Sequence, residues 1–494
     1  MAKFNKKQTT SEVANLAGGQ AYSLDARTEL VTMLLSSFMT VQYYRSADDA
    51  LKRLRELVAR VDAEFAMKAA IYARDKFHLR SVTHAVAAEL AATAKGAPGL
   101  RRFLQNVVQR PDDIAEIISD YLSAHGERRA NGKAKLPSGL KKGLRQAFDH
   151  FDDYQIAKYK METREWAMVD LVNMLRPVPT ERNAKALREL VEDKLAAADT
   201  WEANLSKAGG DQAAKEETWS RLLREKKLGY MALLRNLRNI EQQAPGLIDL
   251  ACEQLTDEEK IRGSKVLPFR YYTAFKHTKD ARLRAAISDA CDTALANVPE
   301  LKDTCVFVDV SGSMETPAGG GQTTCMEAAA LFAAVCAKAS MSDIVQFSTG
   351  AAYFKYNPRD NPRDSVLGIA RQIIDSAEIG GTSFMAAIGA LTKPYERLMF
   401  FSDMQGWLDP DFSVSYLPRY RDYAHAALQQ YKKEYRVDPW VYCIDLCGYG
   451  TSKFPLGDSK VIELAGFSER LFQLLRFAEE DRHVLMREIE AVAI

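Results

Sequence analysis

The stretch Cys305–Ser313, which reads CVFVDVSGS, decides the fold of the second part of this 494-residue chain. Its β-branched, apolar run Val306–Val308 predicts a strand that is buried on both faces, as in a parallel sheet. The run ends in Asp309, Ser311 and Ser313, whose side-chain oxygens recur at every second residue. Such oxygens at the carboxyl end of a strand suit a small hard cation, although a plain polar turn with a helix cap fits the same pattern.

From about residue 301 onward, short apolar runs alternate with helical patterns. The predicted strands are 306–309, 343–347, 398–401 and 440–444, with an edge strand at 351–356. The predicted helices are 324–340, 365–375, 420–435 and 468–491, with one more after Gly380. This alternation predicts an α/β fold of the Rossmann-like, doubly wound type, with a sheet that is mostly parallel.

The residues before 300 follow a helical period with hardly a strand-like run. Residues 1–20 are polar and contain glycine, so we expect a flexible N-terminal tail there. From Asp25 onward the pattern predicts roughly sixteen short helices with short connectors. Successive helix pairs favour an α-solenoid, in which each pair buries its apolar face on the next pair. A compact helical bundle is the alternative, because the sequence has no clean repeat.

The overall composition is that of an ordinary globular protein, with 47% hydrophobic residues and a net charge of +1. The seven cysteines contain no C-x-x-C pair and lie mostly in apolar segments, so we expect reduced core residues. No stretch approaches the length of a membrane span and the start has no apolar core of a signal peptide, which predicts a cytoplasmic protein. No histidine pairs with a nucleophile in a known catalytic context, so we predict that the chain is not an enzyme.

One segment, Arg128–Arg164, is strongly basic. It contains ten Lys and Arg residues and four acidic residues, so its net charge is +6, whereas the net charge of the whole chain is +1. Tyr154 and Tyr159 lie among these charges, and cations with interleaved aromatics suit phosphate neutralisation and base stacking. A solvated loop and helix face is the alternative. The candidate RNA-binding residues of the segment are Lys133, Lys135, Lys141, Lys142, Arg145, Lys158, Lys160 and Arg164.

Several strings in the first 300 residues together resemble the TROVE module, which telomerase-associated protein, the Ro autoantigen and vault proteins share. These strings are Tyr43–Arg45, Ile71–Arg74, Leu79-Arg80 with Thr83-His84, Leu136-Pro137 with Gly139–Lys141, Ala157–Lys160, Met231–Leu237 and Leu267–Phe269. The resemblance covers residues 20–295 and continues into the second domain, so the whole chain is similar to the bacterial members of the Ro family. It implies a closed, monomeric ring of HEAT-like helical repeats with a basic central hole.

The resemblance also implies a function. Ro proteins bind small noncoding Y RNAs on the outer surface of the ring, and they bind misfolded noncoding RNAs whose single-stranded 3′ ends thread the hole. In bacteria a Y RNA can tether the ring to a 3′-exoribonuclease. For this chain the resemblance therefore implies an RNA-binding scaffold in RNA quality control or decay, with Y-like RNA, misfolded RNA and such a nuclease as partners.

The family's RNA-contacting residues carry over only in part. Lys158 and Lys160 match its K-Y-K string, and Arg164 is the counterpart of a following arginine at a spacing that differs by about one residue. Where the family often has a histidine near the end of the next helix, this chain has Arg176, which keeps a cation and a stacking surface. His84 is either an RNA contact or a core histidine on a helix, with hydrogen-bond partners inside the protein.

The second domain resembles a von Willebrand factor A domain, whose metal-ion-dependent adhesion site combines three loops. Its D-x-S-x-S loop corresponds here to Asp309, Ser311 and Ser313, its threonine to Thr382, and its aspartate to Asp403. A set of oxygen ligands with few charges favours Mg²⁺, with Mn²⁺ as the alternative. The resemblance implies that an acidic protein ligand can complete the coordination of the metal.

These observations predict a tail at 1–20, a TROVE helical-repeat domain at 21–298 and a von Willebrand factor A-like domain at 299–494. Three functions compete. The first is the RNA-binding scaffold, the second is a protein-interaction module that captures an acidic partner at the metal, and the third is a metal-dependent nuclease. The nuclease is disfavoured because a two-metal site needs more converging acids than Asp309 and Asp403.

Overall fold

The computed structural model divides the chain into two units by its internal contacts. The mixed unit comprises residues 1–47 and 219–485, and the helical unit comprises residues 48–218 and 486–494. The structure describes residues 11–36, 46–126, 135–161, 165–408 and 423–494, apart from short gaps at 197, 199–203, 206–207, 265, 267, 299, 319–322, 357–363, 457, 459, 466–478 and 480–483.

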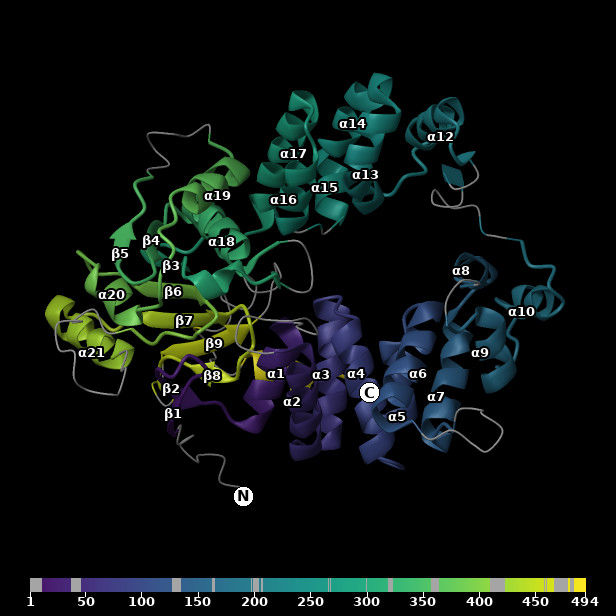
Figure 1. The fold of residues 1–494 in the computed structure, drawn as a ribbon, viewed down its shortest axis with the longest axis horizontal. Helices are drawn as coiled ribbons and strands as arrows, with labels where there is room; N and C mark the ends of the chain where they lie inside the picture. Colours follow the sequence, from purple (N-terminus) through teal and green to yellow (C-terminus); the bar gives the residue numbers. More distant parts are fainter. Residues whose placement is uncertain are drawn as a thin grey trace. The chain divides into compact units, whose positions relative to one another are not determined.

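The mixed unit is organised around a six-stranded sheet in the order β5-β4-β3-β6-β7-β9 (Figure 1). Its strands are β3 (Thr304–Asp309), β4 (Asp343–Phe347), β5 (Ala351–Tyr353), β6 (Arg397–Ser402), β7 (Trp440–Asp445) and β9 (Val461–Ala465). Every neighbouring pair is parallel except β4 and β5, which pair antiparallel at the edge. The predicted parallel-dominated sheet and its edge strand are confirmed, and β9 was not predicted.

Helices cover both faces of this sheet. They are α18 (Cys325–Ser340), α19 (Val366–Asp375), α20 (Phe384–Gly389) and α21 (Ala424–Tyr435). On one face α20 and α21 share an apolar core with Phe307 and Phe400, whose rings stack with centroids 4.2 Å apart. On the other face Phe332 of α18 stacks on Phe401 at 5.1 Å, and α19 packs against α18. Because successive strand residues point to opposite faces, the strands must be apolar throughout, as the predicted buried run requires.

The N-terminal segment forms a small antiparallel sheet. Its strands are β1 (Glu12–Ala14), β2 (Gln20–Ser23) and β8 (Thr451–Ser452), in the order β1-β2-β8. The predicted tail at 1–20 is therefore wrong for residues 11–20, and residues 1–10 lie outside the described part of the chain. The reason is a pairing with residues more than 400 positions away, Tyr22 opposite Ser452, which a local sequence pattern cannot indicate.

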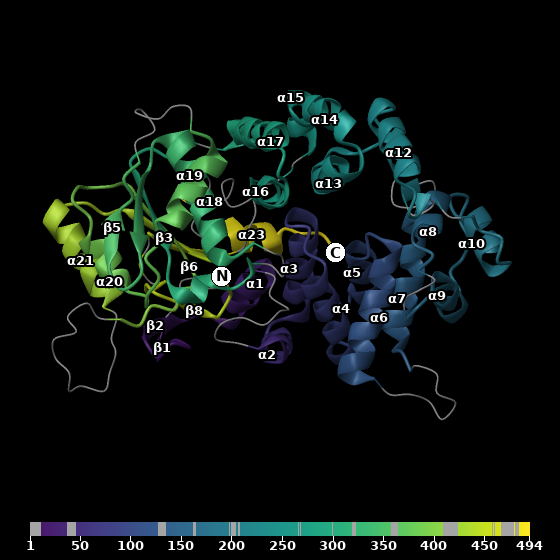
Figure 2. The same ribbon diagram turned by 45° about the horizontal axis from the view of Figure 1, so that its top comes forward.

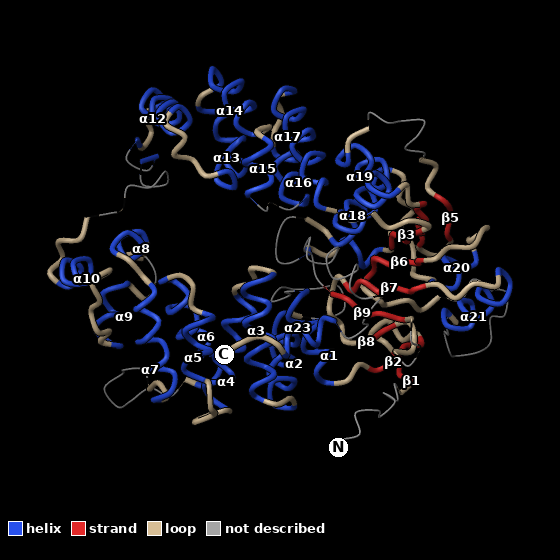
Figure 3. The backbone as a smooth tube through the Cα atoms, turned by 180° about the vertical axis from the view of Figure 1, so that it is seen from behind, coloured by secondary structure: helices blue, strands red, loops and turns tan. Residues whose placement is uncertain are grey.

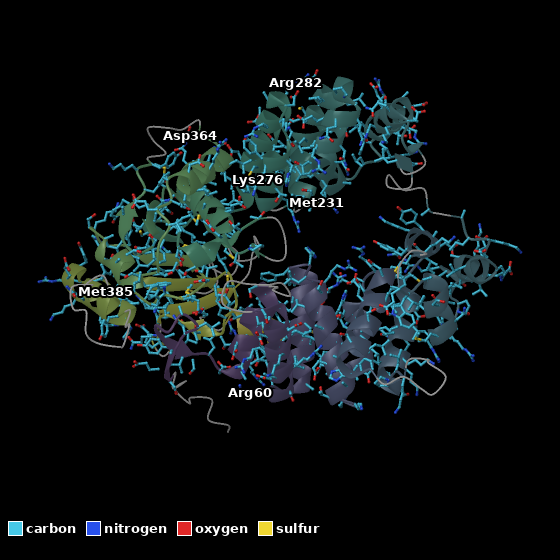
Figure 4. The ribbon with its side chains drawn as sticks, in the orientation of Figure 1. Arg60, Met231, Lys276, Arg282, Asp364 and Met385 are labelled. Atoms are coloured by element: carbon cyan, nitrogen blue, oxygen red, sulfur yellow. The ribbon has the colours of Figure 1, made fainter. Side chains whose placement is uncertain are left out.

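The helices that precede β3 also belong to the mixed unit. They are α1 (Ala26–Ser36), α13 (Tyr230–Gln243), α14 (Ile248–Leu255), α15 (Glu258–Ser264), α16 (Pro268–His277) and α17 (Ala281–Thr293). Helix α16 is joined to α18 because Lys276, labelled in Figure 4, forms a 2.6 Å ion pair with Glu327. Asp292 of α17 pairs with Lys338 of α18. These polar contacts place residues 219–298 in the same unit as the sheet. The boundary between the two compact units therefore differs from the predicted domain boundary at residue 298.

The helical unit contains the remaining helices. They are α2 (Ala47–Arg60), α3 (Ala63–Lys76), α4 (Ser81–Thr93), α5 (Leu100–Val107), α6 (Pro111–His125), α7 (Ser138–Ala147), α8 (Asp153–Lys158), α9 (Met168–Leu175) and α10 (Ala184–Val191), while α12 (Gln212–Arg224) spans the boundary and α23 (Val484–Glu490) ends in this unit. Helix α4 packs on α6 and α5 on α7, so one helix hairpin stacks on the next (Figure 2). Such packing fits both an α-solenoid and the helical-bundle alternative, so the α-solenoid stays a prediction. Closure into a ring stays a prediction.

All strands that the structure describes fall in the mixed unit (Figure 3). None of the described helices combines the length and the apolar composition that a bilayer span needs.

Candidate functional site

The five predicted metal ligands lie in three loops at one edge of the six-stranded sheet. Asp309 ends β3 and begins the first loop, and Asp403 directly follows β6, the strand beside it. Thr382 immediately precedes Ser383, the N-cap of α20. Parallel strands end at the same edge, which is why residues 94 positions apart in sequence converge here. All five side chains are buried, with at most 3% of their surface exposed.

Main-chain hydrogen bonds tie the three loops together. The N–H of Gly312 in the first loop donates to the carbonyl of Gly380 in the second, at 3.1 Å. The carbonyl of Thr382 accepts the N–H groups of Trp407 and Leu408, at 2.9 and 3.0 Å, from the loop that follows Asp403. Backbone hydrogen bonds therefore hold the three loops next to one another.

The side chains of the first loop also make local hydrogen bonds. The Ser311 N–H donates to Asp309 Oδ1 at 2.9 Å, and the Ser402 hydroxyl donates to Asp309 Oδ2. The hydroxyls of Ser311 and Ser313 lie 3.3 Å apart. Two hydroxyls and a carboxylate thus face the same small space.

The electrostatics of the site fit a cation. Burial raises the pKa of both Asp309 and Asp403 above the ordinary carboxyl value, and the charge of Asp309 raises that of Asp403 further. Asp403 Oδ2 is buried and has no hydrogen-bond partner among the described residues. Two buried carboxylates are unfavourable unless a positive charge balances them. No three His, Cys, Asp or Glu side chains gather into a metal cluster within the described residues, so a cation here would depend on the hydroxyls as well.

A contact that the sequence did not predict supports the third loop. In the N-terminal hairpin, Asn15 Nδ2 donates to the carbonyl of Gly406 at 2.8 Å, and the Leu16 N–H donates to Gln405 Oε1 at 2.8 Å. The ammonium of the buried Lys453 also donates to the carbonyl of Gly406, at 3.1 Å. The segment predicted to be a tail therefore holds the loop that carries Asp403. Pairs almost 400 residues apart leave no pattern in a single sequence.

The predicted RNA-binding residues of the basic segment are placed on and around α7 and α8, except Lys133 and Arg164, which lie outside the described residues. Helix α7 carries Lys141, Lys142 and Arg145 and no acidic residue. Lys135 and Lys142 are exposed. Arg145 is half-buried and donates from Nε to the carbonyl of Leu175 at 2.6 Å, so part of its guanidinium serves the end of α9.

The K-Y-K string at the end of α8 forms a small cationic and aromatic cluster. Lys158 is exposed, and its ammonium lies 5.8 Å from the centroid of the Tyr159 ring. The guanidinium of Arg110 lies over the same ring at 4.8 Å. Lys160 donates to the carbonyl of Leu195 at 2.9 Å, which anchors its ammonium to the protein. The exposed cation of the string is therefore Lys158.

Arg176, the residue at the position of the family's histidine, is exposed and ends α9. Its φ of 52° is left-handed, and its N–H bonds to the carbonyl of Val172. The side chain therefore leaves the helix at a sharp turn, where it is open to solvent.

His84 is not an RNA contact in this structure, which corrects its place among the candidate residues. Its side chain is fully buried between two carboxylates, with Nδ1 3.0 Å from Glu116 and Nε2 3.2 Å from Asp113. Burial alone would lower the pKa of His84, but the two acids outweigh it and hold the pKa above the ordinary value. The core alternative for His84 is the one that the structure supports.

The same cluster explains three of the residues that carry the TROVE resemblance. Arg74 and Arg80 both pair with Asp113, at 2.9 and 2.6 Å, and Arg80 also pairs with Asp112 at 3.0 Å. Together with His84 they form a buried ion network between α3, α4 and the start of α6. These motif residues hold helices together.

Comparisons with known proteins bear on the same residues. A model of the TROVE domain matches residues 27–193 and 192–294, which together exceed half of the chain. Telomerase protein component 1 of Mus musculus and of Rattus norvegicus are each 23% identical over 358 residues, which is 55% of this chain and 13% of theirs. The chain therefore spans only a small part of these two relatives.

A solved structure shares the fold over almost the whole chain. The crystal structure of the RO (RSR) protein of Deinococcus radiodurans superimposes with a TM-score of 0.60 at 18% identity, over 92% of this chain and all of that one. At this identity the likeness concerns the fold. With the family model covering residues 27–294, the chain belongs to the TROVE-domain family.

Proposed function

We propose that this protein is an RNA-binding scaffold, similar to bacterial Ro proteins, that binds small noncoding RNA through the exposed cations of α7 and α8. The observation that carries the proposal is that Lys142 and Lys158 are exposed and form no ion pair with a carboxylate within the described residues. Unpaired surface cations can release counterions when they bind phosphates, which supplies most of the affinity for RNA. Tyr159 adds an aromatic ring beside Lys158.

The finer parts of the proposal come from the family resemblance. Y-like RNA would lie on this surface, while the single-stranded 3′ end of a misfolded RNA would enter the hole of a closed, monomeric ring. A 3′-exoribonuclease tethered through the RNA would degrade such ends, so the chain would act in RNA quality control or decay without being an enzyme itself.

A mobility-shift titration with a small structured RNA across a salt series tests the proposal. Lys142→Glu with Lys158→Glu should weaken binding by roughly tenfold or more and lower the slope of log affinity against log salt by about 1.5 to 2. Arg60→Glu is the matched control, since Arg60 is an exposed arginine at the end of α2 in the same unit (Figure 4). Unchanged affinity and slope in the double variant would contradict the role of this surface.

We also infer a second function for the mixed unit, which we propose is a von Willebrand factor A-like domain that holds Mg²⁺ or Mn²⁺. The supporting observation is the buried, unbonded Asp403 Oδ2 beside Asp309 and the loop hydroxyls. Asp309, Ser311, Ser313, Thr382 and Asp403 would hold the cation, which supplies positive charge for an acidic protein ligand. Loss of Mn²⁺ binding in Asp403→Ala, measured by electron paramagnetic resonance, tests this; undiminished binding would refute it.

A further inference from the structure

A large, open cavity lies within the helical unit, and neither Lys142 nor Lys158 is among its described lining residues. Its volume is about 1250 Å³, and it is bounded by the turn between α4 and α5, the end of α6 and the start of α7. These four helices pack side by side, α4 on α6 and α5 on α7 (Figure 2). The carboxyl ends of α4 and α6 and the amino ends of α5 and α7 therefore meet around one space.

The charged side chains among the described lining residues are all cations, and Ile494 at the end of the chain also lines the cavity. The described lining residues include Lys95, Arg101, Arg102 and Lys135, and none of them is Asp or Glu. All four side chains are exposed. Within the described residues no ion pair joins Lys95, Arg101 or Arg102 to a carboxylate, whereas the buried Arg74 of α3 and the half-buried Arg80 before α4 both pair with acids. Lys95, Arg101 and Arg102 thus concentrate positive charge around the cavity, which has room for an anion.

The position of the arginines in α5 makes this arrangement unfavourable by itself. Arg101 and Arg102 lie in the first turn of α5, where the partial charge of the helix is already positive. The N-cap, Gly99, has no side chain to accept the first N–H groups, and no acid lies in the first turn. Helix α7 also begins without a side-chain cap or a first-turn acid, after Pro137. A stable fold tolerates such local conflicts mainly where a ligand resolves them.

We propose that this cavity binds the phosphate groups of a short RNA segment, as a docking site additional to the surface of α7 and α8. The inference rests on the proposed function for the source of the phosphates. The size of the cavity favours a polymer, because sites for small molecules usually measure about 300–1,000 Å³. Exposed cations around an open space also suit a flexible strand with several phosphates. A free polyphosphate shares this chemistry, and the test separates the two sources.

The test uses the full chain with Lys95→Gln, Arg101→Gln and Arg102→Gln, the cavity variant, and Arg60→Glu as the control. The probes are a single-stranded RNA of a dozen nucleotides and inorganic triphosphate, titrated by fluorescence anisotropy and by calorimetry across a salt series. We expect the cavity variant to bind the RNA roughly tenfold or more weakly, with a salt slope lower by about 2, since each phosphate contact on a single strand contributes about 0.7. The control should match the wild type.

A second readout separates a binding role from a structural one. Because Arg101 and Arg102 oppose the helix dipole, neutralising them should raise the melting temperature of the RNA-free protein while it weakens binding. A lower melting temperature together with weaker binding would overturn the proposal, because the loss would then come from damage to the fold.

The remaining outcomes distinguish this proposal from the proposed function. If the cavity variant binds RNA as the wild type does, while Lys142→Glu with Lys158→Glu loses binding, the cavity is not an RNA site and the proposed function stands. If wild-type protein binds triphosphate in the cavity but binds no RNA, the cavity does not take its phosphates from RNA. The proposed function as an RNA-binding scaffold then fails as well. If each variant binds RNA more weakly and the losses add when the substitutions are combined, the result supports both the cavity site and the proposed function.

Discussion

The substitution Asp113→Asn probes the buried ion network of the helical unit. Asp113 is fully buried and serves several donors at once. Arg74 Nη2 lies 2.9 Å from one of its carboxylate oxygens, while Arg80 Nη2 at 2.6 Å and His84 Nε2 at 3.2 Å lie near the other. The substitution keeps the shape of the side chain and removes its charge. It therefore tests whether the network depends on that charge.

The expected loss follows from what the substitution leaves behind. Arg74 is 4% exposed, so its guanidinium would remain buried without the carboxylate of Asp113 with which it pairs. Removing one partner of a buried ion pair costs about 3–5 kcal/mol. The main-chain N–H groups of Gln109 and Arg110, which donate to Asp113 Oδ2 at 3.0 and 2.9 Å, would each face an amide that can present its NH₂ group instead. For a unit of this size the loss lowers the melting temperature by roughly 6–20 °C.

The network also predicts two pH dependences of opposite sign. The pKa of His84 is raised in the folded state, so its contribution is complete below pH 6.5 and is lost as the pH rises through the folded value. The pKa of Asp113 is lowered because its cationic neighbours outweigh the effect of burial. Its contribution is therefore present above the ordinary pKa of 3.8 and is lost as the pH falls below that value.

Differential scanning calorimetry between about pH 2 and pH 9 measures both effects, with Asp149→Asn as the control. Asp149 is an exposed carboxylate of the same unit, so its substitution should change stability by less than about 0.5 kcal/mol. In wild-type protein the transition of the helical unit should fall as His84 loses its proton, and Asp113→Asn should weaken that dependence. If Asp113→Asn costs no more than the control, the network contributes no net stability and the reasoning fails.

Three further predictions address the metal loops and the cavity. Asp403→Asn should raise the melting temperature of metal-free protein, because it removes a buried carboxylate beside another, and should abolish any rise on adding Mg²⁺; a thermal-shift assay measures both. Gly19→Ala should displace the third metal loop and weaken Mn²⁺ binding, because its Cβ would lie 2.1 Å from the Gly406 carbonyl oxygen; equal Mn²⁺ affinity would contradict the supporting role of the hairpin. Arg102→Glu should stabilise the RNA-free protein by about 0.3–1 kcal/mol, as an acid in the first turn of α5 would, and chemical denaturation can detect this change.

A strand of the sheet could be predicted where the residue pattern of that strand alone is typical of a buried strand. The run at 398–401 is apolar and partly aromatic, and the run at 343–347 contains Ile344, Val345 and Phe347; β6 and β4 occupy these runs to within one residue at each end. Strand β9, Val461–Ala465, was missed because Glu463 interrupts its apolar run, and only pairing with β7 makes it a strand. The predicted helix at 468–491 lies mostly outside the described residues, and its described end is α23.

The metal loops were predictable for a different reason. Each candidate ligand stands just after a predicted strand or just before a predicted helix, and parallel strands bring such positions to one edge. Burial was not predictable in the same way. The helical period puts His84 on one face of α4, but its acidic partners stand about 30 residues further along the chain, in α6. Only the stacking of one hairpin on the next decides that this face is internal.

The cations of the helical unit lie in two kinds of environment, one with acidic partners and one without. This contrast supports a ligand for the cavity. At one end of α4, Arg80 lies among three carboxylates, and the neighbouring Arg74 has a carboxylate within 2.9 Å. At the other end of α4, beyond Thr93, the cavity gathers Lys95, Arg101 and Arg102, and its described lining contains no Asp or Glu side chain. Both groups occur within the same stacked hairpins, so the overall supply of acids does not explain the difference. Paired cations hold helices together, and cations left open at the end of the same helices remain available for charges that the chain does not provide.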